Sequence, residues 1–218
     1  MDLTNYLKIK EMLGPNITLV AVSKGQPIDK IMSLYELGHR DFGENFLQEL
    51  DQKKQQLPND IKWHFLGNIQ SNKLSKIVRS SFMIHSVSRK KIYDQLINLD
   101  EKETTRILLQ LKLGHEKTKS GFSEEDAFSI VRNHNENSKI KIKGLMAISE
   151  NNVQNVEILN QFKSAHIFFK SLQSLTNQID TLSMGMSNDY EMAILCKSNL
   201  IRLGDNYIWR QELGWKVK

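Results

Sequence analysis

A lysine closes the first apolar, β-branched run of the chain and carries its most reactive group. Residues 18–24 read TLVAVSK, and Gly25, Gln26 and Pro27 follow Lys24 at once. A buried strand that ends in this way places an amine at the edge of a sheet. There, partial desolvation can remove its proton near neutral pH and let it attack an aldehyde. A lysine at a strand end also commonly reaches water, and this segment alone favours that ordinary role.

The ends of the other apolar runs supply partners for this amine. The residues at those ends are Gly43, Glu44, Asn45, Gly67, Asn68, His85, Ser86, Met146, Ala147, Met184, Gly185, Met186, Ser187, Arg202, Leu203, Gly204 and Asp205. If the strands are parallel, their carboxyl ends meet on one face, and an amine, an amide, a hydroxyl and a guanidinium converge there. This combination favours an aldehyde cofactor that carries a phosphate, and it reverses the preference for an ordinary role of Lys24.

The phosphate end of such a ligand has its own candidates. Gly185 lets the backbone approach closely, Ser187 adds a hydroxyl, and we expect a helix to begin at about Asn188 or Asp189. Free N–H groups and the helix dipole favour an anion at a helix N-terminus. An equal alternative is that Ser187 only caps the helix. Gly204 offers a second close approach of the backbone.

Two further residues could have a structural role instead of a functional one. Arg202 could face the ligand or pair with a carboxylate such as Glu44. His64, inside an apolar run, is typical of a hydrogen-bonded core histidine rather than a catalytic base. Because the histidines are not paired with cysteine or carboxylate at metal-ligand spacing, we expect no metal site.

Short apolar runs alternate along the chain with segments whose apolar residues recur at helical spacing. The runs cover residues 18–22, 41–43, 63–66, 82–87, 106–113, 142–148, 181–184 and 200–203. About eight strands therefore alternate with about eight helices, counting a leading helix over 3–13. Repeated β-then-α units predict an α/β fold with a parallel sheet, and eight of them close most naturally into a single (β/α)8 TIM-type barrel. An open doubly wound sheet is the alternative, and we expect one domain over 1–218.

Composition indicates an ordinary globular protein of the cytoplasm. The chain has 218 residues, 39% of them hydrophobic, and no apolar stretch approaches the roughly 20 residues that cross a bilayer. No signal peptide is visible at the N-terminus. The single cysteine, Cys196, fits a reducing compartment, and its apolar neighbours at helical spacing favour a packed thiol.

The positive charge does not by itself predict a nucleic-acid partner. The net charge is +5, and the lysines are dispersed in short clusters such as Lys53 and Lys54. None of these clusters is interleaved with aromatic residues as in a nucleic-acid motif, so we assign most of the charge to solvated helix faces. A small phosphorylated ligand suits this balance.

Seven segments together resemble the pyridoxal phosphate homeostasis protein family, which consists of single-domain relatives of the alanine racemase barrel. The segments are LVAVSK with Pro27, FGEN at 42–45 with Gln48 and Glu49, WHFLGNIQSNK at 63–73, KSG at 119–121, GLMAI at 144–148, LSMGMSND at 182–189 with Ala193 and Ile194, and RLG at 202–204. The resemblance runs from about residue 17 to 204. It implies the barrel of the alanine racemase N-terminal domain, the type III fold of pyridoxal phosphate (PLP) proteins.

The resemblance also implies a role for each matched residue. Lys24 would hold PLP as a Schiff base, while Asn45 and Met184 would line the cofactor. Ser187 and Gly204 would hold the phosphate, and Arg202 would face the pyridine nitrogen. A cation there keeps the nitrogen unprotonated and weakens the ring as an electron sink, which suits a carrier or a racemase better than a transaminase.

The chain departs from the family's pattern at three positions. Gly25 replaces the usual threonine after the lysine, and Lys112 replaces an asparagine. Asp205 stands where a hydroxyl residue would donate to the phosphate. Two like charges about 4 Å apart repel by roughly 1 kcal/mol in water and roughly 4 kcal/mol at an effective dielectric of 20. Asp205 therefore either offers only its backbone N–H or weakens phosphate binding.

The resemblance implies a non-catalytic PLP-binding protein of vitamin B6 homeostasis. PLP-dependent apoenzymes would be its partners, and a monomer is weakly favoured. One alternative is an amino-acid racemase-like PLP enzyme, which needs a base on each face of its substrate. Racemases of this class take the second base from a β-rich domain, and we expect none here because the sequence ends shortly after the last strand. The other alternative is a degenerate member with weakened binding because of Asp205.

Overall fold

A closed barrel of eight parallel strands forms the centre of the protein. We describe a computed structural model over residues 4–100, 103–114, 120–204 and 207–209. The strands are β1 (Thr18–Val22), β2 (Asp41–Glu44), β3 (Lys62–Phe65), β4 (Met83–Val87), β5 (Thr105–Leu111), β6 (Ile140–Ala147), β7 (Thr181–Ser183) and β8 (Leu200–Leu203). They follow one another in sequence order, and β1 pairs with β8 to close the ring. The predicted barrel is therefore confirmed, and the open sheet is excluded.

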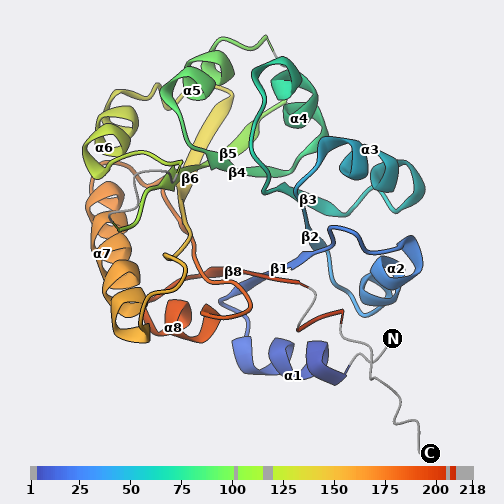
Figure 1. Cartoon of the computed structure of the whole chain (residues 1–218). Coiled ribbons are helices and arrows are strands. Elements are labelled where there is room, and N and C mark those ends of the chain that lie inside the picture. The colour runs from blue at the N-terminus through green and yellow to red at the C-terminus, as the bar shows by residue number, and fades with distance from the viewer. Residues whose placement is uncertain (1–3, 101–102, 115–119, 205–206, 210–218) are drawn as a thin grey trace, which may run out of the picture.

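The helices lie outside the strands and cover the barrel on all sides (Figure 1). They are α1 (Thr4–Leu13), α2 (Ile28–Glu36), α3 (Leu47–Gln56), α4 (Leu74–Ser80), α5 (Lys90–Ile97), α6 (Glu124–Asn133), α7 (Asn155–Gln173) and α8 (Tyr190–Leu195), with a short 3-10 turn η1 (Ser71–Lys73) before α4. Each of the strands β1 to β7 leads to a helix that returns the chain to the other end of the barrel, as right-handed crossovers require. That one domain spans 1–218 stays a prediction.

Alternation along the strands separates an outer core from the barrel interior. Leu19 and Ala21 of β1, with Trp63 and Phe65 of β3, belong to the main hydrophobic core. Successive strand residues point to opposite faces, so the intervening positions face inward. A smaller apolar group of Met83, Leu108 and Met146 fills part of that interior. Several other inward positions are polar, including His64, which is almost completely buried.

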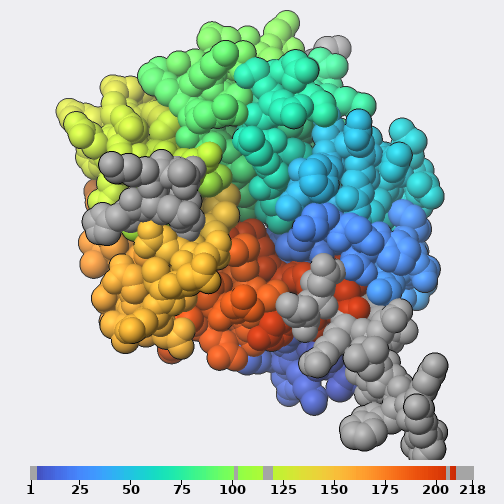
Figure 2. Space-filling model, viewed as in Figure 1, coloured from blue at the N-terminus to red at the C-terminus, as the bar shows by residue number. Residues whose placement is uncertain are grey.

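Closure of the ring sets the first and last strands side by side. Val20 of β1 lies opposite Arg202 of β8, and Ala21 lies opposite Leu203. In the space-filling view, blue residues of the first strand region meet orange and red residues of the last one (Figure 2). Trp209 packs back on this junction, where its indole Nε1 donates to the Val22 carbonyl oxygen at 2.7 Å.

Candidate functional site

Lys24 stands two residues after the end of β1 and is an exposed residue rather than a desolvated one. Its neighbours on both sides are tied to β2 and α3. The Ser23 backbone N–H donates to the Gly43 carbonyl oxygen at 2.9 Å, and the Gly25 N–H donates to Glu49 Oε1 at 2.6 Å. Gly25 has a φ of +72°, a left-handed conformation that glycine adopts without strain. The turn after β1 thus favours the glycine that replaces the family's threonine.

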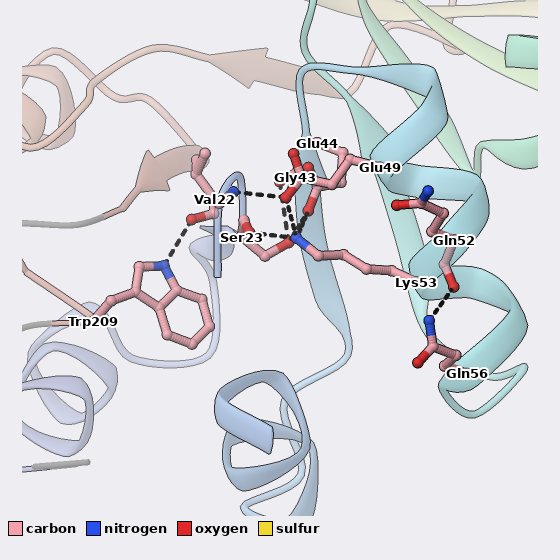
Figure 3. A network of polar contacts seen from close by, with 10 residues as sticks. Val22, Ser23, Gly43, Glu44, Glu49, Gln52, Lys53, Gln56 and Trp209 are labelled. Atoms are coloured by element: carbon pink, nitrogen blue, oxygen red, sulfur yellow. Dashed lines mark hydrogen bonds and ion pairs between the residues drawn. The ribbon is translucent and has the colours of Figure 1, made fainter. Parts of the chain in front are cut away.

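A buried ionic cluster behind this turn fixes its main chain (Figure 3). We call Ser23, Glu44, Glu49 and Lys53 the outer network, because it lies between the barrel and α3. Lys53 Nζ donates to the Ser23 carbonyl oxygen at 2.6 Å, to Glu44 Oε1 at 2.7 Å and to Glu49 Oε1 at 2.6 Å. These three acceptors satisfy all three donors of an ammonium group. The Ser23 hydroxyl also donates to Glu44 Oε1, at 2.6 Å.

The centre of the outer network is shielded from water. The Glu44 side chain has no solvent exposure and that of Lys53 has 6%. Burial raises the pKa of Glu44 above its ordinary range, while the hydrogen bonds from Lys53 and Ser23 oppose that shift. Lys53 is an exception to the expectation that most of the charge lies on solvated helix faces, because its ammonium turns inward to the Glu44 carboxylate.

A cavity of about 290 Å³ opens at the carboxyl ends of the strands beside Lys24. We call it the strand-end cavity. It is lined by Val22, Lys24, Asn45, Leu66, Met146, Ile148, Met186, Ser187, Arg202 and Gly204. Five predicted residues thus come together there, namely Lys24, Asn45, Ser187, Arg202 and Gly204. A larger hollow of about 660 Å³ between α4 and α5 lies among the outer helices and contains none of them.

Arg202 reaches the strand-end cavity from the barrel interior. Its Nη1 donates to Ser183 Oγ at 2.5 Å, and its Nη2 donates to the Ala147 carbonyl oxygen at 3.0 Å. Burial lowers the pKa of Arg202 to about 10, an effect that the nearby Asp189 charge partly opposes. The guanidinium therefore stays charged at neutral pH. The alternative pairing with Glu44 is wrong, since Glu44 points away from the interior toward Lys53.

The loop between β7 and α8 carries Ser187. Gly185 has a φ of +95°, and a Cβ there would lie 2.8 Å from Tyr190 Cα, so only glycine fits without a shift. Asp189 is buried and organises the loop: its Oδ1 accepts the Met186 N–H at 2.6 Å, and its Oδ2 accepts the Ser149 hydroxyl at 2.5 Å. The cap of α8 is Asp189 rather than Ser187. The Ser187 hydroxyl is thus not used as a helix cap.

Two other predicted residues are not placed in the cavity. Met184 is fully buried in the main hydrophobic core and does not line the cavity. Alternation explains this, because Ser183 points into the barrel and its neighbour must point outward. Met186, two residues later, lines the cavity instead. Asp205 lies outside the described residues.

Four apolar residues of the cavity wall were not among the predicted ligand contacts. They are Val22, Leu66, Met146 and Ile148, each at or just after a strand end. Inward-facing positions at strand ends were a usable signal for them. Lys53 had a weaker signal, since Glu49 stands four residues earlier on the same face of α3.

Two classes of feature are missing from the described part of the chain. None of its helices is long and apolar enough to cross a membrane. No three histidine, cysteine, aspartate or glutamate side chains among the described residues gather as metal ligands would. Cys196 is a buried free thiol, as expected from its neighbours.

Comparisons with known proteins show the family of this chain. The family described as alanine racemase, N-terminal domain, matches residues 3–206. The pyridoxal phosphate homeostasis protein of Vibrio alginolyticus is 34% identical over 197 residues, which cover 87% of this chain and 84% of that protein.

Solved structures give the same result. PipY of Synechococcus elongatus PCC7942, solved with PLP bound, superposes with a TM-score of 0.84 at 32% identity, covering 92% of this chain and 96% of PipY. Alanine racemase of Corynebacterium glutamicum shares the fold alone, with a TM-score of 0.69 at 16% identity and coverage of 92% of this chain and 57% of the racemase. The chain belongs to the pyridoxal phosphate homeostasis protein family, on the barrel of the alanine racemase N-terminal domain.

Proposed function

We propose that this chain binds PLP in the strand-end cavity and serves as a non-catalytic protein of PLP homeostasis. The observation that carries the proposal is the meeting of one amine, one guanidinium, one amide and one hydroxyl in a single cavity. The homeostasis protein of Vibrio alginolyticus is 34% identical to this chain, and PipY has been solved with PLP bound.

The cavity fits the chemistry of PLP. A planar ring suits apolar walls such as Leu66 and Met146, while a phosphate suits cations and hydrogen-bond donors. None of the described lining residues carries a carboxylate that would repel the phosphate. At about 290 Å³ the cavity is close to the lower end of the usual size range for small-molecule sites.

Each residue then has a distinct task. PLP supplies an aldehyde that a lysine amine binds reversibly, and Lys24 Nζ would form a Schiff base with its C4′ carbon as one water leaves. The outer network would hold the Lys24 main chain while the exposed side chain reaches the aldehyde. Arg202 would face the pyridine nitrogen, Asn45 the ring, and Ser187 and Gly204 the phosphate.

Absence of turnover is part of the proposal. Racemisation needs a base on each face of the substrate, and Lys24 supplies one. Among the described residues that line the cavity, no tyrosine, histidine, cysteine or carboxylate offers a second. We therefore expect this protein to hold PLP and release it to PLP-dependent apoenzymes. The cytoplasm is the proposed location, and the single, buried cysteine fits its reducing conditions.

Titration of the purified chain with PLP tests the proposal. We expect a new absorption band of a protonated Schiff base in the wild type and in Lys54→Ala, whose lysine is an exposed residue of α3. Lys24→Ala should lose the band and keep its cooperative unfolding transition. A wild type that gains no band would refute PLP binding. Robust racemase activity on common amino acids would refute the non-catalytic role.

Asp205 provides a separate test of the degenerate alternative. If its carboxylate faces the phosphate, Asp205→Thr should tighten PLP binding about fivefold, the equivalent of roughly 1 kcal/mol. Equilibrium titration of both proteins at the same ionic strength measures this ratio. An unchanged affinity would mean that Asp205 points away and that the alternative is wrong.

A further inference from the structure

A continuous row of polar side chains crosses the barrel interior and ends at the strand-end cavity. We call it the inner network: Arg202, Ser183, His85, His64 and Asp41. Its contacts run from Arg202 Nη1 to Ser183 Oγ at 2.5 Å, from Ser183 Oγ to His85 Nδ1 at 3.1 Å, from His85 Nε2 to His64 Nδ1 at 2.8 Å, and from His64 Nε2 to Asp41 Oδ1 at 3.1 Å. Each residue comes from a different strand.

The middle of this row is buried. His64, His85 and Ser183 are at most 1% exposed, and Arg202 is 5% exposed. Asp41, at the opposite end of the barrel from the cavity, is half-buried. Burial lowers the pKa of His85 well below its ordinary value, and the nearby Arg202 charge acts in the same direction. A neutral His85 has one N–H donor and one bare nitrogen acceptor.

The chemistry of the two ends gives every hydrogen bond its direction. Arginine has only donors, so Ser183 Oγ must accept from Arg202. A carboxylate has only acceptors, so His64 Nε2 must carry a proton and donate it to Asp41. If both histidines are neutral, His64 Nδ1 is bare and accepts from His85 Nε2. His85 Nδ1 is then also bare, and it accepts the Ser183 hydroxyl proton.

The other arrangement leaves a donor without a partner. If His64 were doubly protonated, its Nδ1 would donate to His85 Nε2, and His85 Nδ1 would donate to Ser183. The Ser183 hydroxyl oxygen would then accept from both His85 and Arg202. No described residue would be left to accept the proton of the Ser183 hydroxyl. A buried unsatisfied hydroxyl is costly, so the geometry favours the neutral, one-directional row.

We propose that Ser183, His85, His64 and Asp41 are positioning residues for Arg202, acting as one hydrogen-bond relay that runs from the guanidinium to the Asp41 carboxylate. With its proton directed to His85, the Ser183 hydroxyl can present only a lone pair to Arg202. That lone pair and the Ala147 carbonyl oxygen hold two guanidinium nitrogens in place. The consequence for the cofactor rests on the proposed function, whereas the relay itself does not.

Histidine tautomers test the relay directly. Two-bond 1H–15N NMR of the full chain at pH 8, with and without PLP, reports which ring nitrogen carries the proton, and His64→Gln and His85→Gln assign the signals. We expect both rings to be neutral with the proton on Nε2. A doubly protonated His64, or a proton on Nδ1 of either ring, would overturn the relay. This result stands even if the chain binds no PLP.

A matched pair of substitutions tests the positioning role. Ser183→Thr keeps the hydroxyl, and Ser183→Val has nearly the same volume as that variant without the hydroxyl. We expect Ser183→Val to weaken PLP binding at least tenfold relative to Ser183→Thr and to shift the pH titration of the bound PLP absorption, because Arg202 loses its acceptor. Equal affinities and titrations in the two variants would refute the positioning role.

Discussion

The inner network reaches the strand-end cavity through Arg202, whereas the outer network lies behind the turn that carries Lys24, and the two handle charge in opposite ways. The outer network concentrates charge: Lys53 Nζ lies within 2.7 Å of Glu44 Oε1 and Glu49 Oε1. Lys53 also donates to the Ser23 carbonyl oxygen, and Glu49 accepts the Gly25 N–H, so the main chain is held on both sides of Lys24. The inner network separates charge, with Arg202 and Asp41 at its ends and three buried neutral groups between them. The first fixes a backbone, and the second orients a side chain. In this protein, ion pairs therefore hold the turn after β1, whereas a chain of neutral hydrogen bonds crosses the buried barrel interior.

The largest effect should come from removing the central cation of the outer network. Lys53→Met leaves the unexposed Glu44 carboxylate without its counterion, and we expect a loss of about 3–5 kcal/mol in the free energy of unfolding. Urea denaturation measures this loss. PLP affinity should fall as well, because the Lys24 main chain loses its anchor.

Lys54→Met is the matched control, since it removes the same charge from an exposed neighbouring position of α3. It should change the free energy of unfolding by less than about 1 kcal/mol. The double variant Glu44→Leu/Lys53→Met should recover part of the loss, because an apolar pair replaces an uncompensated charge. Equal losses in Lys53→Met and Lys54→Met would contradict the assigned role of the outer network.

The pH dependence of stability should have opposite signs beside the inner network and within the outer one. His39, whose Nε2 contacts the Asp41 carbonyl oxygen at 2.8 Å, has its pKa lowered by burial from 6.5 to about 4. Between these values the unfolded chain binds a proton that the folded chain does not. The free energy of unfolding therefore falls by about 3 kcal/mol from this group as the pH drops from 6.5 to 4.

Glu44 acts in the opposite sense. Its pKa is raised, so the folded chain binds the extra proton, and the free energy of unfolding falls as the pH rises above 4.5. Urea titrations between pH 4.5 and 7 should give a flatter profile for His39→Gln and a steeper acid loss for Glu44→Gln. Parallel profiles for the two variants would show that the two regions do not differ in this way.

The smallest effect concerns a single neutral hydrogen bond at the same turn. Trp209→Phe removes the indole donor to the Val22 carbonyl oxygen and keeps an aromatic ring. We expect a loss of about 1 kcal/mol in the free energy of unfolding, well below that of Lys53→Met. Urea denaturation of the two variants side by side ranks the contributions. A loss for Trp209→Phe as large as that for Lys53→Met would refute this order.

Most of the barrel could be predicted from local patterns. Each strand is a short apolar run bounded by turn residues, and it alternates with a segment whose apolar residues recur at helical spacing. The position of Lys24 followed in the same way from the end of one strand. Met184, which the resemblance places against the cofactor, lies in the main hydrophobic core instead, because its neighbour Ser183 points into the barrel.

The two networks depend on contacts that no local pattern contains. Lys53 stands among polar residues, as a lysine on an exposed helix face does. Only the packing of α3 on β2 shows that it is buried. His85 and Ser183 are 98 residues apart and meet because the ring closes. The register across a closed barrel is set by all eight strands together, so one sequence does not reveal which inward side chains will touch.

The central claim is that Lys24 holds PLP covalently in the strand-end cavity. Borohydride reduction of the PLP-treated full chain, followed by peptide mapping with mass spectrometry, tests it most directly because reduction makes a Schiff base permanent. We predict one phosphopyridoxyl group per chain, on the peptide that contains Lys24. Labelling of other lysines with Lys24 unmodified, or no labelling at all, would contradict the account.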